Sequence, residues 1–201
     1  MAISVNRPLK DTNTKPETTG YTSNILKLFI EGLEGQPQKQ VLDVGPACHE
    51  NIIFFTRHVK RLYICDMFFH LMRCLSKKRP VSQIWKHLDY PSESFDGILL
   101  WELTDRLDEQ EAVEFVELCY KMLKPGGMVV VFVLGEQSVS SVVNTFVVGK
   151  DFRVHLRPQP HLHLPLSDRQ NRDVLAMMAP FTPVKSYVCR HGLREFLFKR
   201  E

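Results

Sequence analysis

The chain has 201 residues, a length typical of one compact domain. Its 26 Lys and Arg residues nearly balance 23 Asp and Glu residues, so the formal net charge is only +3. A composition of 44% hydrophobic and 24% charged residues excludes disordered, collagen-like and disulfide-scaffold proteins. A basic excess this small does not indicate nucleic-acid binding, and no nucleic-acid partner is expected.

Five cysteines are scattered along the chain without a CxxC pair, so neither a disulfide framework nor a zinc ribbon is expected. The sequence has no stretch typical of a signal peptide and no apolar run of about 18 residues. These features predict a cytoplasmic protein that does not bind membranes. The polar residues 1–21 are predicted to form a flexible arm, and residues 22–201 a single domain.

The first elements alternate between helix and strand. Residues 23–33 have apolar side chains at helical spacing, which predicts an amphipathic helix. Residues 41–44 form a short apolar strand, and residues 51–58 a second helix. The unit then recurs, with a strand over residues 62–65 and a helix over residues 67–76.

The middle of the chain continues this alternation. A weak third strand is predicted over residues 82–86 and a fourth over residues 95–101. Residues 109–123 place their apolar side chains on one broad helical face. The most apolar β-branched run, residues 128–134, is typical of a central parallel strand buried on both faces.

The C-terminal part changes this rhythm. A helix is predicted over residues 168–179, followed by two strand-like runs over residues 184–189 and 194–199 that flank a turn at His191 and Gly192. The predicted fold class is therefore α/β. We expect a doubly wound, mostly parallel seven-stranded sheet with helices on both faces and a C-terminal antiparallel hairpin.

Ligands of open parallel sheets bind beyond the carboxyl ends of the strands. This rule selects four segments, namely residues 43–50, Asp66, residues 89–90 and residues 101–105. A carboxylate at a strand end is rigidly placed to accept hydrogen bonds from a ligand.

Several motifs in these segments resemble one family when they are taken together. The stretch VLDVGPACHEN is followed 23 positions after Asp43 by Asp66, and then by HLDYPSESFDGILLWEL and KMLKPGGMVVVF. Their order resembles that of the class I, Rossmann-like S-adenosylmethionine-dependent methyltransferases, over about residues 23–136. The combination of these motifs in this order is more specific for the family than any single motif.

The resemblance implies S-adenosylmethionine as the cofactor and methyl transfer to a small-molecule acceptor. It implies that Asp43 and Gly45 serve the methionine end, Asp66 the ribose and Asp89 the adenine. Trp101 and Glu102 would line the pocket. The other candidate cofactor contacts are neighbours of these residues in sequence: Pro46, Ala47, His49, Asn51, Met67 and Tyr90.

The loop after the first strand departs from the family pattern. The family usually has Gly-x-Gly-x-Gly, whereas this loop retains only Gly45 and has His49 at the last position. Histidine adds bulk where such a turn commonly needs positive φ. Either His49 and its neighbours contribute to binding, or the chain is a catalytically inactive methyltransferase-like binding or partner protein. An NAD-binding oxidoreductase is less well supported, because Gly-x-Gly-x-x-Gly is missing.

Structural roles compete with these assignments. Asp43 could satisfy the amides of its own turn, and Asp66 could cap the following helix. Asp89 could belong to an ordinary turn, and Trp101 could be either core or pocket wall. Four acidic side chains follow the fourth strand: Glu102, Asp105, Glu109 and Glu111. They are predicted to belong to the solvated start of a helix, and only Glu102 is expected to face a ligand.

Residues 151–166 alternate apolar side chains with basic or titratable ones, as expected of an extended segment. The segment could be a solvated edge or could bind an anionic or aromatic substrate. His155, His161 and His163 are weak candidates for a catalytic base, because imidazole titrates near neutrality. No metal site is expected, since two ligands on one strand lack a third and a fourth. Three nearby arginines are predicted to lie at the surface: Arg169, Arg172 and Arg190.

Overall fold

The computed structural model describes residues 20–34, 38–135, 141–189 and 192–201. The predicted arm lies outside these ranges except for Gly20 and Tyr21, and so does Arg190. Within the described ranges, no helix is long and apolar enough to cross a membrane.

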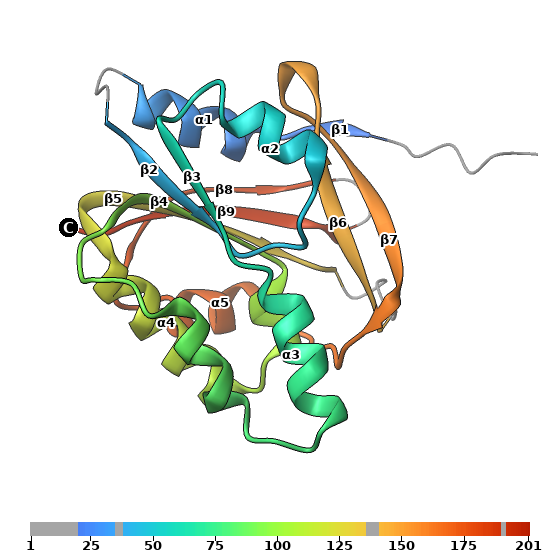
Figure 1. Ribbon diagram of the computed structural model, residues 1–201. Coiled ribbons are helices and arrows are strands. Elements are labelled where there is room, and N and C mark those ends of the chain that lie inside the picture. The colour runs from blue at the N-terminus through green and yellow to red at the C-terminus, as the bar shows by residue number, and fades with distance from the viewer. Residues whose placement is uncertain (1–19, 35–37, 136–140, 190–191) are drawn as a thin grey trace, which may run out of the picture.

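A six-stranded sheet forms the centre of the molecule (Figure 1). Its strands lie in the order β3 (Arg61–Ile64), β2 (Gln40–Asp43), β4 (Phe95–Trp101), β5 (Leu123–Val133), β9 (Arg194–Lys199) and β8 (Thr182–Val188). The first four strands are parallel, and β9 pairs antiparallel with both β5 and β8. The predicted fold class is confirmed.

The predicted strand over residues 82–86 is wrong. This segment lies in the 3-10 helix η1 (Val81–Leu88), so the sheet has six strands and not seven. The buried side chains of η1 are Val81, Ile84 and Leu88. That spacing of three to four residues covers one face of a helix, whereas a half-buried strand needs a period of two.

Helices cover both faces of the sheet. One face carries α1 (Asn24–Leu33) and α2 (His49–Phe55), and the other carries α3 (Met67–Ser76), α4 (Glu109–Met122) and α5 (Asn171–Met177) (Figure 1). Side chains of β4 alternate between the two layers. Leu99 and Trp101 pack in the α1 and α2 layer, and Ile98 and Leu100 pack in the opposite one. Burial on both faces explains the continuous apolar runs of β4 and β5.

A second, antiparallel sheet contains β1 (Tyr21–Thr22), β7 (Arg153–His163) and β6 (Val142–Val148) in that order. The sequence analysis predicted the extended segment that becomes β7, but it did not identify its partner β6. Asn51 of α2 holds β6 in place: its Nδ2 donates to Phe146 O at 2.9 Å, and its Oδ1 accepts from Val148 N at 2.8 Å.

A buried ion pair joins the end of β4 to the β6–β7 hairpin. Glu102 Oε1 and Arg106 Nη2 are 3.0 Å apart, and both side chains are 0% exposed. Asn144 N of β6 donates to the same Glu102 oxygen at 3.1 Å, and Arg106 Nη1 lies 3.4 Å from Ser141 O and from Leu164 O. A buried charge without its partner is strongly destabilising, so this pair requires the hairpin to dock in one position.

Three charged residues that were predicted to be solvated are buried. Glu102 and Asp105 lie inside the molecule and not in a solvated helix start, and Arg169 is not a surface residue. Arg169 Nη2 donates to Leu107 O at 2.8 Å and to Asp108 O at 3.1 Å. Backbone carbonyl oxygens therefore take the place of water around this guanidinium.

Asp105 lies in the short 3-10 helix η2 (Leu103–Arg106) and is 1% exposed. Its Oδ2 accepts a hydrogen bond from Leu134 N at 2.7 Å. Burial raises the pKa of Asp105 to about 7, and the nearby Glu102 adds to this rise. The Leu134 N–H and the guanidinium groups of Arg169 and Arg106 act in the opposite direction. This carboxyl group therefore changes charge near neutral pH.

The raised pKa of Asp105 predicts a pH-dependent stability. Its folded-state pKa of about 7 lies above the ordinary value of 3.8 for an aspartate, so the folded protein binds the proton more tightly between these values. This carboxyl group then makes the free energy of unfolding fall with rising pH from about 4 to about 7, by at most about 1.4 kcal/mol per pH unit. Asp105→Asn should give a shallower slope in urea unfolding across this range. Asp168→Asn, at an exposed position, should leave the slope unchanged. Equal slopes for the wild-type protein and both variants would contradict the raised pKa of Asp105.

Close packing at Gly97 predicts a second stability effect. A Cβ atom there would lie 2.5 Å from Phe29 Cζ in the α1 layer, so Gly97→Ala must displace a buried ring. We expect a loss of about 1–3 kcal/mol in the free energy of unfolding, measured by urea denaturation. Gly149→Ala is the control, because its Cβ would lie 3.6 Å from Arg153 O and nothing needs to move. Equal effects of the two variants would show that the ring adjusts freely.

Candidate functional site

The carboxyl ends of β2, β3 and β4 bring the predicted site segments together. Asp43 at the end of β2 is in register with Ile64 of β3 and with Leu99 of β4. The loop after β2 also contacts the segment after β3, because Ala47 N donates to Asp66 Oδ2 at 3.3 Å. This edge is where a parallel sheet binds its ligand.

The loop after β2 folds without the glycines of the family pattern. Residues 45–49 all have negative φ, and His49 is the first residue of α2. The expectation that His49 occupies a position needing positive φ is therefore wrong. Gly45 is required for a different reason: a Cβ atom there would lie 2.4 Å from Trp101 Cδ1.

Trp101 fills the space above Gly45. Its indole is stacked on Phe146 of β6, with ring centroids 5.8 Å apart and an interplanar angle of 10°. Its Nε1 donates to Asp43 Oδ1 at 2.6 Å, and the residue is 2% exposed. Its φ of 52° is a strained conformation for a bulky residue, and such strain is found mostly at functional sites. In this structure Trp101 is part of the core.

Asp43 is sealed beneath the indole. Its Oδ1 also accepts from Gly45 N at 2.9 Å, which is the turn role considered for it from the sequence. Burial raises the pKa of Asp43 to about 6, although the Trp101 and Gly45 hydrogen bonds favour the charged form.

Asp66 is held rigidly and remains partly exposed. Its Oδ1 accepts from Phe69 N at 2.9 Å, so the residue caps α3 as the structural alternative predicted. Its Oδ2 accepts the Ala47 hydrogen bond described above. A carboxylate offers about four acceptor positions, so both oxygens can still accept a hydrogen bond from a ligand.

Asp89 follows η1 and is exposed, whereas the Tyr90 ring packs edge-on against Phe95 at 5.0 Å and Tyr63 at 5.9 Å. Asn51 and Glu102 are already bonded to β6, as described above. The structure therefore divides the predicted contacts into two groups. The carboxylates expected to meet a nucleoside are accessible, whereas the residues expected at the methionine end are covered by the Trp101 ring.

The candidate catalytic histidines all lie on β7. His155 is partly buried, while His161 and His163 are exposed. The His163 ring makes its hydrogen bonds within the hairpin, 3.2 Å from Ser141 Oγ and 3.0 Å from Pro160 O. The described part of the chain contains no group of three His, Cys, Asp or Glu residues that could hold a metal ion.

Two partners of this site were not predicted from the sequence. Phe146 stacks on Trp101, and Arg106 pairs with Glu102. The run Val142–Val148 is rich in β-branched residues, and this was the signal that could have identified β6. Glu50 of α2 also forms an ion pair with Arg157 of β7, which lies in the segment 151–166 considered for substrate binding.

Both the sequence of the middle of the chain and its fold are similar to those of known proteins. Residues 42–131 match a family model described as a methyltransferase domain, and no curated protein sequence matches the chain. An S-adenosylmethionine-dependent methyltransferase from Clostridium acetobutylicum has the same fold, with a TM-score of 0.54 and 12% identity over 88% of this chain and 89% of that chain. The N-methyltransferase NodS from Bradyrhizobium japonicum gives a TM-score of 0.53 and 17% identity over 88% and 92%.

A third structure contains a bound cofactor product. The 1,6-didemethyltoxoflavin-N1-methyltransferase from Burkholderia thailandensis, solved with S-adenosylhomocysteine, gives a TM-score of 0.50 and 17% identity over 87% of this chain and 76% of that chain. These similarities establish the fold. Residues 42–131, which are less than half of the chain, are similar in sequence to a methyltransferase domain.

Proposed function

We propose that the protein transfers the methyl group of S-adenosylmethionine to a small-molecule acceptor. The bound cofactor supplies a methyl group that its sulfonium already activates, so the protein needs mainly to position the reactants and exclude water. The observation that carries the proposal is the carboxylate of Asp66. Two backbone N–H groups hold it at the carboxyl edge of the sheet while it remains partly exposed.

The accessible carboxylates suit a nucleoside. Asp66 would accept hydrogen bonds from the two ribose hydroxyls, and Asp89 would accept one from the adenine amino group. Asp43, Asn51, Trp101 and Glu102 already have protein partners, and they would bind the cofactor only after rearrangement. The other proposed contacts surround the two carboxylates: Gly45, Pro46, Ala47, His49, Met67 and Tyr90.

An acceptor that must lose a proton would also need a base. His155, His161 and His163 remain the proposed candidates, because a neutral imidazole accepts a proton near pH 7. His155 is the most protected of the three from solvent, being only partly exposed.

The proposal predicts that Asp66→Asn weakens cofactor binding without unfolding the protein. Asn caps a helix about as well as Asp, so α3 should be retained, whereas the charge-assisted hydrogen bonds to the ribose are lost. We expect the dissociation constant of S-adenosylhomocysteine to rise about 10-fold to 100-fold in isothermal titration calorimetry.

Asp108→Asn is the matched control, since Asp108 caps α4 by accepting from Glu111 N at 2.8 Å. It should leave the dissociation constant within about twofold of the wild-type value. Absence of any binding of S-adenosylmethionine or S-adenosylhomocysteine to the wild-type protein would overturn the proposed methyl transfer.

The position of Trp101 favours a second candidate, a catalytically inactive protein that binds ligands with a methyltransferase fold. The indole covers Gly45 and takes the Asp43 carboxylate as its hydrogen-bond acceptor. With the ring in this place, a nucleoside could occupy the accessible edge while the methionine end of a cofactor could not be accommodated.

This candidate predicts that the wild-type protein binds adenosine at least as tightly as S-adenosylhomocysteine. Trp101→Phe removes the indole N–H and part of the ring, so it should improve the affinity for S-adenosylhomocysteine relative to adenosine by about tenfold or more. Trp85→Phe is the control, because the only other tryptophan packs on Phe115 between η1 and α4. A wild-type protein that prefers S-adenosylhomocysteine by a large factor would eliminate this candidate.

A further inference from the structure

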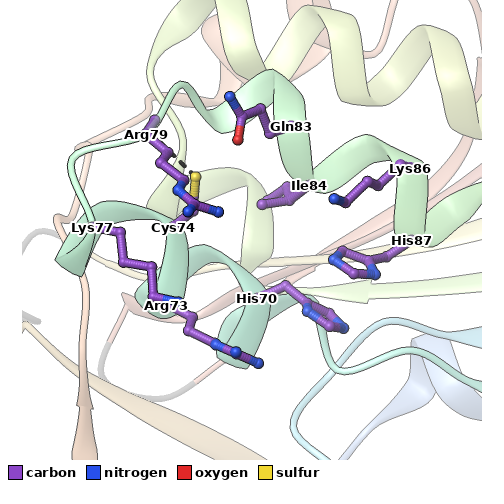
Figure 2. A pocket seen from close by; sticks show the side chains of 9 residues that line it. All are labelled: His70, Arg73, Cys74, Lys77, Arg79, Gln83, Ile84, Lys86 and His87. Atoms are coloured by element: carbon purple, nitrogen blue, oxygen red, sulfur yellow. Dashed lines mark hydrogen bonds between the residues drawn. The ribbon is translucent and has the colours of Figure 1, made fainter.

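A basic cavity of about 200 Å³ lies between α3 and η1 (Figure 2). Its floor includes Ile84 and Cys74, and no acidic side chain lines it. Six of its lining residues are basic or titratable: His70, Arg73, Lys77, Arg79, Lys86 and His87. None of them belongs to the proposed cofactor contacts, so the cavity is a separate feature of the molecule.

The charge of this region is concentrated in the sequence as well as in space. Residues 67–88 contain five Lys and Arg residues and no Asp or Glu, although the whole chain has a net charge of only +3. Without this segment the chain would be slightly acidic.

The cations of the cavity are not neutralised by described neighbours. Among the ion pairs of the described residues, none involves Arg73, Lys77, Arg79 or Lys86. Arg73 and Lys77 lie near the C-terminal end of α3, where cations complement the helix dipole. Lys86 lies in the last turn of η1, where it complements the end of that helix, whereas Arg79 lies in the turn between α3 and η1 and has no such support.

Two structural contacts bring these groups together. Cys74 Sγ lies 3.2 Å from Arg79 O and 3.2 Å from Pro80 O, which holds the chain as it turns back after α3. The rings of His70 and His87 are stacked, with centroids 3.7 Å apart and an interplanar angle of 13°. Figure 2 shows Arg79, Lys86 and this ring pair around one space.

A bound anion would also act on the stacked histidines. Burial lowers the pKa of His70, and the adjacent His87 and Arg73 lower it further, while Asp66 opposes them. A negatively charged ligand in the cavity would favour the protonated ring, because an opposite charge nearby stabilises the charged form of a titratable group.

We propose that this cavity binds a small ligand through a phosphate group. Several cations around one space suit a phosphate dianion better than a singly charged carboxylate, and arginine forms paired hydrogen bonds to phosphate oxygens. Arg79 and Lys86 contact the phosphate from the η1 side and Arg73 contacts it from α3. The open side of the cavity leaves room for the rest of the ligand.

The proposal is tested by calorimetry with inorganic phosphate and with phenyl phosphate, at low and constant ionic strength. The double variant Arg79→Gln, Lys86→Gln should weaken the binding of both probes by about tenfold or more, since each charge-assisted hydrogen bond is worth about that factor. The matched control is Arg61→Gln, Arg153→Gln, which makes the same charge change at two exposed positions outside the cavity. It should change the affinity by less than about twofold.

Three results would overturn the proposal. Equal weakening by the two double variants would show a general charge effect and not a site. Absence of saturable binding of either probe, together with tight binding of a DNA duplex, would identify the region as a nucleic-acid surface. Displacement of phenyl phosphate by S-adenosylmethionine would show that the cavity is part of the cofactor site. Failure of cofactor binding alone would leave this proposal intact, because phosphate is measured without the cofactor.

Discussion

The carboxyl edge of the sheet depends on one buried side chain, the indole of Trp101. It bonds to Asp43 of β2, covers Gly45 and stacks on Phe146 of β6. A ring of this size fits because residue 45 has no Cβ atom. The positive φ of Trp101 costs about 1–3 kcal/mol, and the buried hydrogen bond and aromatic packing offset it. The glycine of the family loop is thus retained here for contact with a protein side chain.

The same edge is tied to the β6–β7 hairpin by three independent links. Trp101 contacts Phe146, Glu102 accepts from Asn144 N, and Asn51 bonds to the backbone on both sides of Val147. The Glu102 and Asn51 links bury polar atoms that would lose their partners if the hairpin moved. Exposing the region around Asp43 and Gly45 therefore requires either rotation of the Trp101 indole while the hairpin stays in place, or displacement of the whole hairpin. Rotation disturbs fewer buried hydrogen bonds.

Local patterns in the sequence predicted most of the fold. α3 and β4 have the predicted bounds, because their buried positions follow one clear period between defined ends. Residues 82–86 were assigned to the wrong element because this short segment contains only one adjacent apolar pair, Ile84 and Trp85. The helical spacing becomes visible only when Val81 and Leu88 are included. The burial of Glu102, Asp105 and Arg169 could not be predicted, since charged residues are usually exposed. Glu102 pairs with nearby Arg106, but the backbone groups that bond these three side chains inside the molecule lie at least 29 residues away in sequence. The roles of Asp43 and Trp101 depend on the same kind of distant contact.

Helix α3 separates the two charged regions of the molecule. Asp66 lies at its N-terminus, where an anion complements the helix dipole, and Arg73 and Lys77 lie near its opposite end. The dipole of α3 therefore explains the positions of this one carboxylate and these two cations. Lys86 is favoured in the same way in the last turn of η1, whereas Arg79 lies between the two helices. Arg73, Arg79 and Lys86 line one cavity, and solvent reduces the repulsion between them because all three residues are exposed. A bound anion would remove that repulsion, whereas a nucleoside beside Asp66 would not. The small net charge of the chain therefore conceals a separation of charge, with a carboxylate at one end of α3 and cations near the other.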